Sequence, residues 1–205
     1  MSNTSEMTSY CILFLVLAVG LICSGCAGFA MRGHRCNGVP MRVMLLDRNA
    51  YNLRRKLPGP MTEIKFITIH NTANRVSAVE ERNYLNSRRD NVSVSFHYAV
   101  DEKEIVQLIP DEQHAWHAGD GTGDGNMKSI SIEICRSLCR DKENRLYLRS
   151  EENAVRLAAW LLKKHGLGVE CLRMHKDWSG KECPHRILEA GSWEDFKRRV
   201  AKAML

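Results

Sequence analysis

Short runs rich in β-branched and aromatic residues constrain the fold of this chain most. Residues 64–70 (IKFITIH) and 129–135 (SISIEIC) have the length and composition of β-strands. Residues 92–100 (VSVSFHYAV) alternate as a strand does, and the DEK turn after them leads to a hairpin partner at residues 104–109. Two shorter strands are expected at residues 41–46 and 171–175. These segments predict the strands of the fold.

End signals predict three helices between and after these strands. The helices are expected at residues 77–89, 151–165 and 193–204. Ser77 with Glu80 three positions later has the pattern of a capping box. Ser150 is expected to cap the second helix, which has acidic residues in its first turn and which Gly166 ends. Ser192 is expected to cap the last helix.

An uncharged run at residues 11–30 (CILFLVLAVGLICSGCAGFA) is about long enough to span a bilayer. Its small-residue end is typical of a signal-peptide cleavage region and looks like a lipoprotein processing site with Cys26 as the lipidated residue. The segment before it has no Lys or Arg, whereas Arg32 and Arg35 follow it, which favours a cytoplasmic C-terminus. We expect residues 1–30 to be a signal peptide or membrane anchor, with the protein exported or anchored at the cell envelope. The alternative location, with the domain after this segment on the cytoplasmic side, stays open.

Two further segments are expected to be irregular. Residues 31–60 are basic and rich in turn residues, and we expect them to form a lead-in that wraps the domain. Residues 120–126 (DGTGDGN) lack the acidic spacing and the closing Glu of an EF-hand, so they predict a plain loop rather than a calcium site.

The net charge of +6 favours an anionic partner such as nucleic acid, a membrane or an anionic wall polymer. The Lys and Arg residues are dispersed and no basic motif is interleaved with aromatic residues, which argues against nucleic acid.

Four cysteines lie after the first forty residues, and Cys135, Cys139 and Cys171 remain if Cys183 binds a metal. Buried free thiols or one disulfide that includes Cys171 both stay open.

The stretch MHKDWSGKECPHRIL at residues 174–188 holds His175, Lys181 and Cys183 close together. A neutral imidazole and a thiolate are both good Zn²⁺ ligands, and a catalytic zinc usually has three protein ligands and one open position. His70 ends a predicted strand, where open sheets place their sites. His70, His175 and Cys183 therefore give a candidate His₂Cys zinc site; a structural His and a free thiol are the alternatives.

Five motifs occur in this order: FITIHNTAN, SFHYAVDEKEIVQLIP, AWHAG, SISIEIC and HKDWSGKECPHRIL. Together they resemble the zinc N-acetylmuramoyl-L-alanine amidases, a family of wall-lytic and wall-recycling enzymes that includes the animal peptidoglycan recognition proteins. The resemblance covers about residues 41–190. It implies a single α/β domain, here residues 61–205, with a central mixed β-sheet flanked by helices and a zinc-containing groove.

The resemblance implies that His70, His175 and Cys183 hold Zn²⁺. The implied reaction is hydrolysis of the amide between N-acetylmuramic acid and L-alanine in peptidoglycan. Glu133 matches the acid/base of the recycling-type members, and it alternates with isoleucines, so it faces away from them. Lys181 offers a positive charge where the oxyanion forms. The alternatives are an exposed strand Glu and a solvated loop Lys.

Where the phage lysozyme-type branch has a catalytic Tyr, this chain has Phe96. This difference favours Glu133 over a tyrosine as the catalytic residue. Asn71, Trp116 and His117 are the expected substrate contacts, and His97 is expected to be structural. Binding-only members tend to lack the Cys, so Cys183 favours an enzyme over a peptidoglycan-binding protein on the same fold. We expect a monomer without a separate wall-binding module.

Overall fold

The computed structural model describes residues 34–205, and its strands form one seven-stranded sheet within that part of the chain. The strands are β1 (Arg35–Cys36), β2 (Val39–Val43), β3 (Phe66–Asn71), β4 (Tyr98–Val100), β5 (Ile105–Gln107), β6 (Ser129–Ile134) and β7 (Leu172–Met174). Their order across the sheet is β1-β2-β5-β4-β6-β3-β7. The β1–β2 and β4–β5 pairs are antiparallel and the other pairs are parallel, so the sheet is mixed, as expected.

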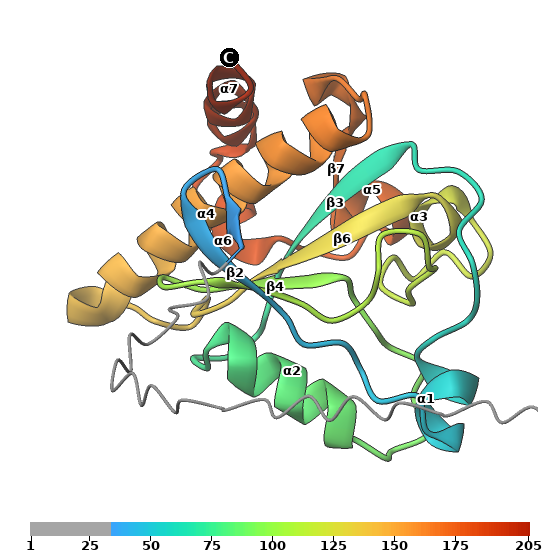
Figure 1. The fold of residues 1–205 in the computed structure, drawn as a ribbon. Helices are drawn as coiled ribbons and strands as arrows, with labels where there is room; N and C mark the ends of the chain where they lie inside the picture. Colours follow the sequence, from blue (N-terminus) through green and yellow to red (C-terminus); the bar gives the residue numbers. More distant parts are fainter. Residues whose placement is uncertain (1–33) are drawn as a thin grey trace, which may run out of the picture. The chain divides into compact units, whose positions relative to one another are not determined.

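Helices cover both faces of the sheet (Figure 1). They are α1 (Ala50–Arg55), α2 (Ala78–Ser87), α3 (Asp124–Met127), α4 (Asn144–Lys164), α5 (His175–Ser179), α6 (His185–Glu189) and α7 (Trp193–Ala203). The long helix α4 packs on one face, and α7 packs against α4. Helix α2 packs on the opposite face over β4 and β5. The predicted α/β architecture is therefore confirmed.

Strands β3 and β6 divide their side chains between an apolar and a polar face. Ile67 and Ile69 of β3 and the isoleucines of β6 are fully buried in the cluster that α4 covers. Each such side chain contributes roughly 1.5–3 kcal/mol by its burial. The alternate residues, among them Thr68, His70 and Glu133, lie on the other face because successive strand side chains point in opposite directions.

The helix predicted at residues 77–89 is α2, and its capping box is present. The Ser77 side chain accepts a hydrogen bond from the backbone of Glu80, and the Glu80 carboxylate accepts one from the Ser77 backbone at 2.8 Å. The last helix also matches its prediction as α7. Ser192 occupies the cap position there, but its side chain makes no capping bond.

The predicted start of the helix at residue 151 is wrong. Helix α4 begins at Asn144, and Ser150 lies inside it, fully buried, with its hydroxyl donating to the Leu146 carbonyl at 2.8 Å. Buried residues at Tyr147, Ser150 and Glu151 continue the helical spacing toward the N-terminus. The serine is therefore part of the buried face and not a cap.

Two other predictions need correction. Of residues 92–100, only Tyr98–Val100 form a strand. The residues before this strand lie outside the sheet, and residues 93–96 line a cavity described below. Residues 120–126 are not a plain loop: the Asp120 carboxylate accepts hydrogen bonds from the backbone of Gly125 and Asn126 as the segment enters α3.

The remaining predictions concern the chain start and the cysteines. Residues 1–30, with the expected signal or anchor, lie outside the described residues. None of the helices found in residues 34–205 combines the length and the apolar composition that a membrane span requires. Residues 34–60 contribute β1, β2 and α1, so the expected lead-in shares in the sheet. The cysteines of the described part are all free: Cys36, Cys135, Cys139, Cys171 and Cys183.

Candidate active site

The candidate site lies at the carboxyl ends of the parallel strands β3, β6 and β7. His70 is the penultimate residue of β3 and lies in register with Glu133 of β6. His175 is the first residue of α5, directly after β7. Cys183 follows the turn after α5, and its carbonyl accepts a hydrogen bond from the Lys176 backbone at 3.0 Å. Open sheets place ligand sites at this edge.

His70, His175 and Cys183 each offer one donor atom, and these atoms lie within 4.8 Å of one another. The Nδ1 atoms of the two histidines are 3.1 Å apart, and the Cys183 Sγ is 3.9 Å from the Nδ1 of His70. All three side chains are buried. Two imidazole nitrogens and one sulfur form a donor set that suits zinc, so the residues present fit such an ion.

The electrostatic environment of the two histidines suits metal binding. Burial lowers the pKa of His70 well below its ordinary value, and the charges of His117, His175 and Lys181 lower it further. Burial likewise lowers the pKa of His175 to about 4. Both imidazoles are therefore neutral at physiological pH, which is the form that binds metal ions. The backbone N–H of Asn71 donates to the Cys183 Sγ at 3.4 Å and helps to hold it in place.

The cluster forms part of the wall of a cavity of about 690 Å³. Phe96 and Trp116 give this cavity an apolar side, and Lys181 is exposed at its opening. Phe96 is buried where the phage-type branch has its Tyr. Tyr98 is fully buried elsewhere and donates a hydrogen bond to Asp111 at 2.5 Å, so it cannot serve this cavity. That arrangement leaves Glu133 as the acid/base candidate.

Glu133 lines the same cavity and lies half-buried beside His70. Its Oε2 atom is buried and has no hydrogen-bond partner among residues 34–205. Burial raises the pKa of Glu133 to about 8, and the charge of Glu81 adds to this rise while Lys181 opposes it. A carboxyl group with a pKa near neutrality can both take and return a proton.

Two of the expected substrate contacts line the cavity but have their polar side-chain atoms engaged. The Asn71 Oδ1 accepts from the Arg186 backbone at 2.9 Å, which ties β3 to α6. The ring nitrogens of His117 lie 3.1 Å from the Nε2 of His70 and 3.3 Å from the carbonyl of Ser129. Trp116 is partly buried and also lines the cavity.

His97 lies in the interior, as expected for a structural histidine. Its Nδ1 pairs with the Ser131 hydroxyl at 2.9 Å and its Nε2 lies 2.8 Å from the Gln113 carbonyl. Burial lowers the pKa of His97 to about 4. This ring therefore joins β6 to the segment that carries Trp116 and takes no part in the metal cluster.

Sequence reasoning missed the residues that hold the segment AWHAG in place. The Asn126 Oδ1 accepts hydrogen bonds from the backbone of His117 and Ala118, both at 2.8 Å. Asp120 in turn accepts from the Asn126 backbone at 3.2 Å. The Asp residues of DGTGDGN were the available signal, because an Asp side chain readily accepts from nearby backbone groups.

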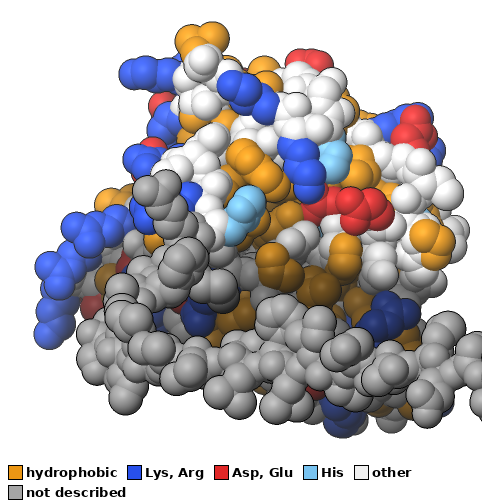
Figure 2. Space-filling view, viewed as in Figure 1, with side chains coloured by type: hydrophobic (Ala, Val, Ile, Leu, Met, Phe, Trp, Pro, Cys, Tyr) orange, Lys and Arg blue, Asp and Glu red, His pale blue; other side chains and the backbone are white. Residues whose placement is uncertain are grey.

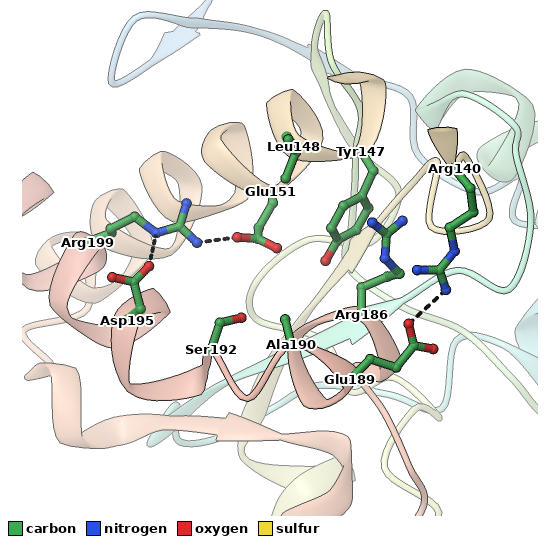
Figure 3. A pocket seen from close by; sticks show the side chains of 10 residues that line it. All are labelled: Arg140, Tyr147, Leu148, Glu151, Arg186, Glu189, Ala190, Ser192, Asp195 and Arg199. Atoms are coloured by element: carbon green, nitrogen blue, oxygen red, sulfur yellow. Dashed lines mark hydrogen bonds and ion pairs between the residues drawn. The ribbon is translucent and has the colours of Figure 1, made fainter. Parts of the chain in front are cut away.

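A second cavity, of about 590 Å³, lies between α4, α6 and α7 (Figure 3). Its charged side chains already have protein partners: Arg199 bridges Glu151 and Asp195, and Arg140 pairs with Glu189 at 2.8 Å (Figure 3). The remaining guanidinium, that of Arg186, lies over the Tyr147 ring and donates to backbone carbonyls. The cavity with the metal cluster is therefore the candidate site, because its donor atoms are the ones that can hold a metal ion.

Comparisons with known proteins show the family of the chain. The family model described as N-acetylmuramoyl-L-alanine amidase matches residues 60–186. Two amidases of Bacillus subtilis (strain 168) are similar: CwlA is 45% identical over 76% of this chain and 55% of its own length, and XlyB is 43% identical over 81% and 50%. This chain thus spans about half the length of the curated relatives that it matches.

Solved structures of similar sequence have the same fold. PlyL superposes with a TM-score of 0.72 at 41% identity, covering 79% of this chain and 97% of PlyL. The catalytic domain of XlyA superposes with a TM-score of 0.68 at 34% identity, covering 79% and 99%. Since the family model matches more than half of the sequence, the chain belongs to the N-acetylmuramoyl-L-alanine amidase family.

Proposed function

We propose that this protein hydrolyses the amide bond between N-acetylmuramic acid and L-alanine in peptidoglycan. One observation carries the proposal: the cluster of His70, His175 and Cys183 shares a cavity with a carboxylate oxygen of Glu133 that has no hydrogen-bond partner in the described part of the chain. The names of CwlA and XlyB, both N-acetylmuramoyl-L-alanine amidases, support the choice of substrate.

His70, His175 and Cys183 are proposed to hold one Zn²⁺ ion. Three protein ligands and one open position are the usual arrangement of a catalytic zinc. When bound, zinc would lower the pKa of a water ligand to about 7 and polarise the scissile carbonyl. The protein supplies this buried donor set from the end of β3, the start of α5 and the segment after α5.

Glu133 is proposed to act as general base and then as general acid. Its carboxylate takes a proton from the attacking water as the new C–O bond forms. The carboxylic acid then gives this proton to the amino nitrogen of L-alanine as the C–N bond breaks. The products are the free lactyl carboxylate and a peptide with a free N-terminus. Proton transfer of this kind typically contributes about 10²–10⁴ in rate.

Lys181 and the cavity walls are proposed to position the substrate. The ammonium group of Lys181 at the cavity opening stabilises the negative oxygen of the tetrahedral intermediate, a role worth about 10²–10³ in rate. The ring of Trp116 offers a flat apolar surface to the sugar or peptide stem. Asn71 and His117 contribute to the same wall as the predicted substrate contacts.

The location of the protein and its attraction to the wall are also proposals. Residues 1–30 would act as a signal peptide or membrane anchor that brings residues 61–205, the predicted amidase domain, to the cell envelope as a monomer. Figure 2 shows Lys and Arg side chains along the edge of the molecule where α4 lies. This basic surface would attract anionic wall polymers.

The test follows zinc content and the release of L-alanine-headed peptides from purified peptidoglycan. We expect about one zinc per chain and measurable release, since a catalytic site holds one ion. Glu133→Gln should keep its zinc and lose about 10²–10⁴ in rate, because it removes only the proton carrier. Cys183→Ala should lose both zinc and activity. Glu143→Gln, which changes a half-exposed glutamate outside the cavity with the metal cluster, should match the wild type.

The outcomes separate the alternatives. Zinc without peptide release would indicate a peptidoglycan-binding protein on the same fold. Absence of zinc in the wild type would overturn the assignment of His70, His175 and Cys183 as ligands.

A further inference from the structure

His117 connects a metal-cluster histidine to the backbone of β6. Its Nδ1 lies 3.1 Å from the Nε2 of His70, and its Nε2 lies 3.3 Å from the Ser129 carbonyl oxygen. The side chain is only 7% exposed, so water does not compete freely for these contacts. The two histidine rings meet nearly at right angles, with an interplanar angle of 88°.

The direction of the hydrogen bonds along this chain of groups follows from the carbonyl at its end. A neutral imidazole carries one proton, and the neutral form is the one that binds a metal ion. A carbonyl oxygen only accepts, so the Nε2 of His117 must be the protonated nitrogen. Its Nδ1 is then an acceptor, and the Nε2 of His70 must donate to it.

This direction leaves the Nδ1 of His70 with a free lone pair. That atom faces the Nδ1 of His175 at 3.1 Å and the Sγ of Cys183 at 3.9 Å. The opposite tautomer of His70 would place a hydrogen between these donor atoms and turn the lone pair away from them. Selection of the tautomer is therefore a condition for metal binding at this position.

We propose that His117 is a positioning residue that fixes the tautomer of His70, so that the Nδ1 lone pair of His70 points into the metal cluster. The proposal rests on the metal-binding part of the proposed function, and it gives His117 a role distinct from substrate contact. Asn126 supports this role because its Oδ1 accepts from the backbone of His117 and of Ala118. The ring of His117 is thus anchored at its backbone and at both nitrogens.

Two substitutions of His117 separate this role from simple packing. His117→Asn places an amide oxygen near the position of the imidazole Nδ1, so the acceptor for His70 is kept. His117→Leu fills the space without an acceptor. Loss of such a partner of a metal-bound histidine typically weakens metal affinity about 10–100-fold. We expect this loss in His117→Leu, and an affinity close to the wild type in His117→Asn.

Competition with a chelator for Zn²⁺ measures these affinities. His114→Leu serves as the matched control, because it makes the same change three positions earlier on the same segment but outside the cavity lining. Its zinc affinity should equal that of the wild type. Equal zinc affinity in His117→Leu and the wild type would overturn the proposal, and so would an equal loss in His117→Leu and His117→Asn.

A second readout needs neither activity nor a metal ion. Long-range ¹H–¹⁵N spectra of the metal-free, full-length protein with labelled histidine report which nitrogen of each ring is protonated. We expect His70 to carry its proton on Nε2 in the wild type and in His117→Asn. Protonation of His70 on Nδ1 in the wild type would refute the proposal even if the leucine variant failed to fold. A wild-type protein that binds no zinc would instead count against the proposed function and leave this spectrum to decide the tautomer.

Discussion

Single side chains on β3 serve either the core or the site, according to the face that they occupy. Ile67 and Ile69 are fully buried under α4, while Thr68 and His70 lie on the opposite face. A shift of the strand by one residue would exchange the two sets. The burial of the isoleucines therefore fixes the register that brings His70 to the metal cluster, and stability and function depend on the same strand.

Asp111 shows how strongly one buried carboxylate can be tied into this fold. It is 1% exposed and accepts hydrogen bonds from Tyr98 at 2.5 Å, Lys164 at 2.7 Å and His165 at 2.9 Å. Burial disfavours its charge, but the hydrogen bonds from His165, Lys164 and Tyr98 outweigh this effect and hold the pKa of Asp111 well below its usual range. The end of α4 is thereby fixed to the segment after β5.

Asp111→Asn should destabilise the protein by about 3 kcal/mol at pH 7, the low end of the range for breaking a buried ion pair, because Lys164 is 40% exposed and can turn to solvent. The folded pKa is depressed, so the stabilisation is fully present above the unfolded value of about 3.9 and is lost as the pH falls below it. Urea unfolding at pH 7 and pH 3 should show the difference between variant and wild type shrinking at the lower pH.

The control for this prediction is Asp195→Asn, which removes a half-exposed carboxylate of surface ion pairs on α7. Exposed pairs contribute about 0–1 kcal/mol, so its effect should be small. An equal difference between Asp111→Asn and the wild type at both pH values would contradict the role assigned to the Asp111 charge.

At the scale of elements, the start of α2 depends on a local signal. Ser77→Ala removes the hydroxyl that accepts from the Glu80 backbone, so it should cost about 1 kcal/mol of the free energy of unfolding. Chemical denaturation measures this loss. Ser87→Ala, at the exposed end of the same helix, should change stability by less. An equal cost for both serines would mean that the cap contributes nothing beyond ordinary helix propensity.

The start of α2 could be predicted because its signal lies within four residues, whereas the start of α4 could not. Ser150 has the composition of a cap, but its environment is the buried face of α4, and only the packed fold shows this. Residues 92–97 failed as a strand for a related reason. Their alternation suits a sheet, but the Ser95 backbone pairs with the Trp116 carbonyl at 2.9 Å beside the cavity.

Much of the candidate site could be inferred from motifs. His70 and Glu133 occupy predicted strands, and His175 and Cys183 belong to one motif at residues 174–188. Their convergence agrees with the register of the sheet. The contacts of His117 could not be inferred. They depend on the position of the Ser129 carbonyl, a backbone atom of β6, and side-chain patterns carry no information about it.

At the scale of the whole molecule, folding assembles the metal cluster from parts of the chain that lie far apart in sequence. His70 and Cys183 are separated by 113 positions, and they approach only when β3 and the segment after α5 are both in place. An unfolded chain cannot offer this donor set at once. Metal binding should therefore stabilise the folded protein through linkage.

Zinc should raise the free energy of unfolding by about 2.7 kcal/mol when free zinc is at 100 times its Kd. Thermal unfolding with zinc and with a chelator measures the shift. Cys183→Ala should lose most of this shift, because it removes the sulfur donor. Cys171→Ala is the matched control, since Cys171 lies outside the cluster and forms no disulfide within residues 34–205, and it should keep the full shift. A zinc-dependent shift that persists in Cys183→Ala would mean that the stabilising ion binds elsewhere. Absence of the shift in the wild type would mean that zinc does not stabilise the folded protein.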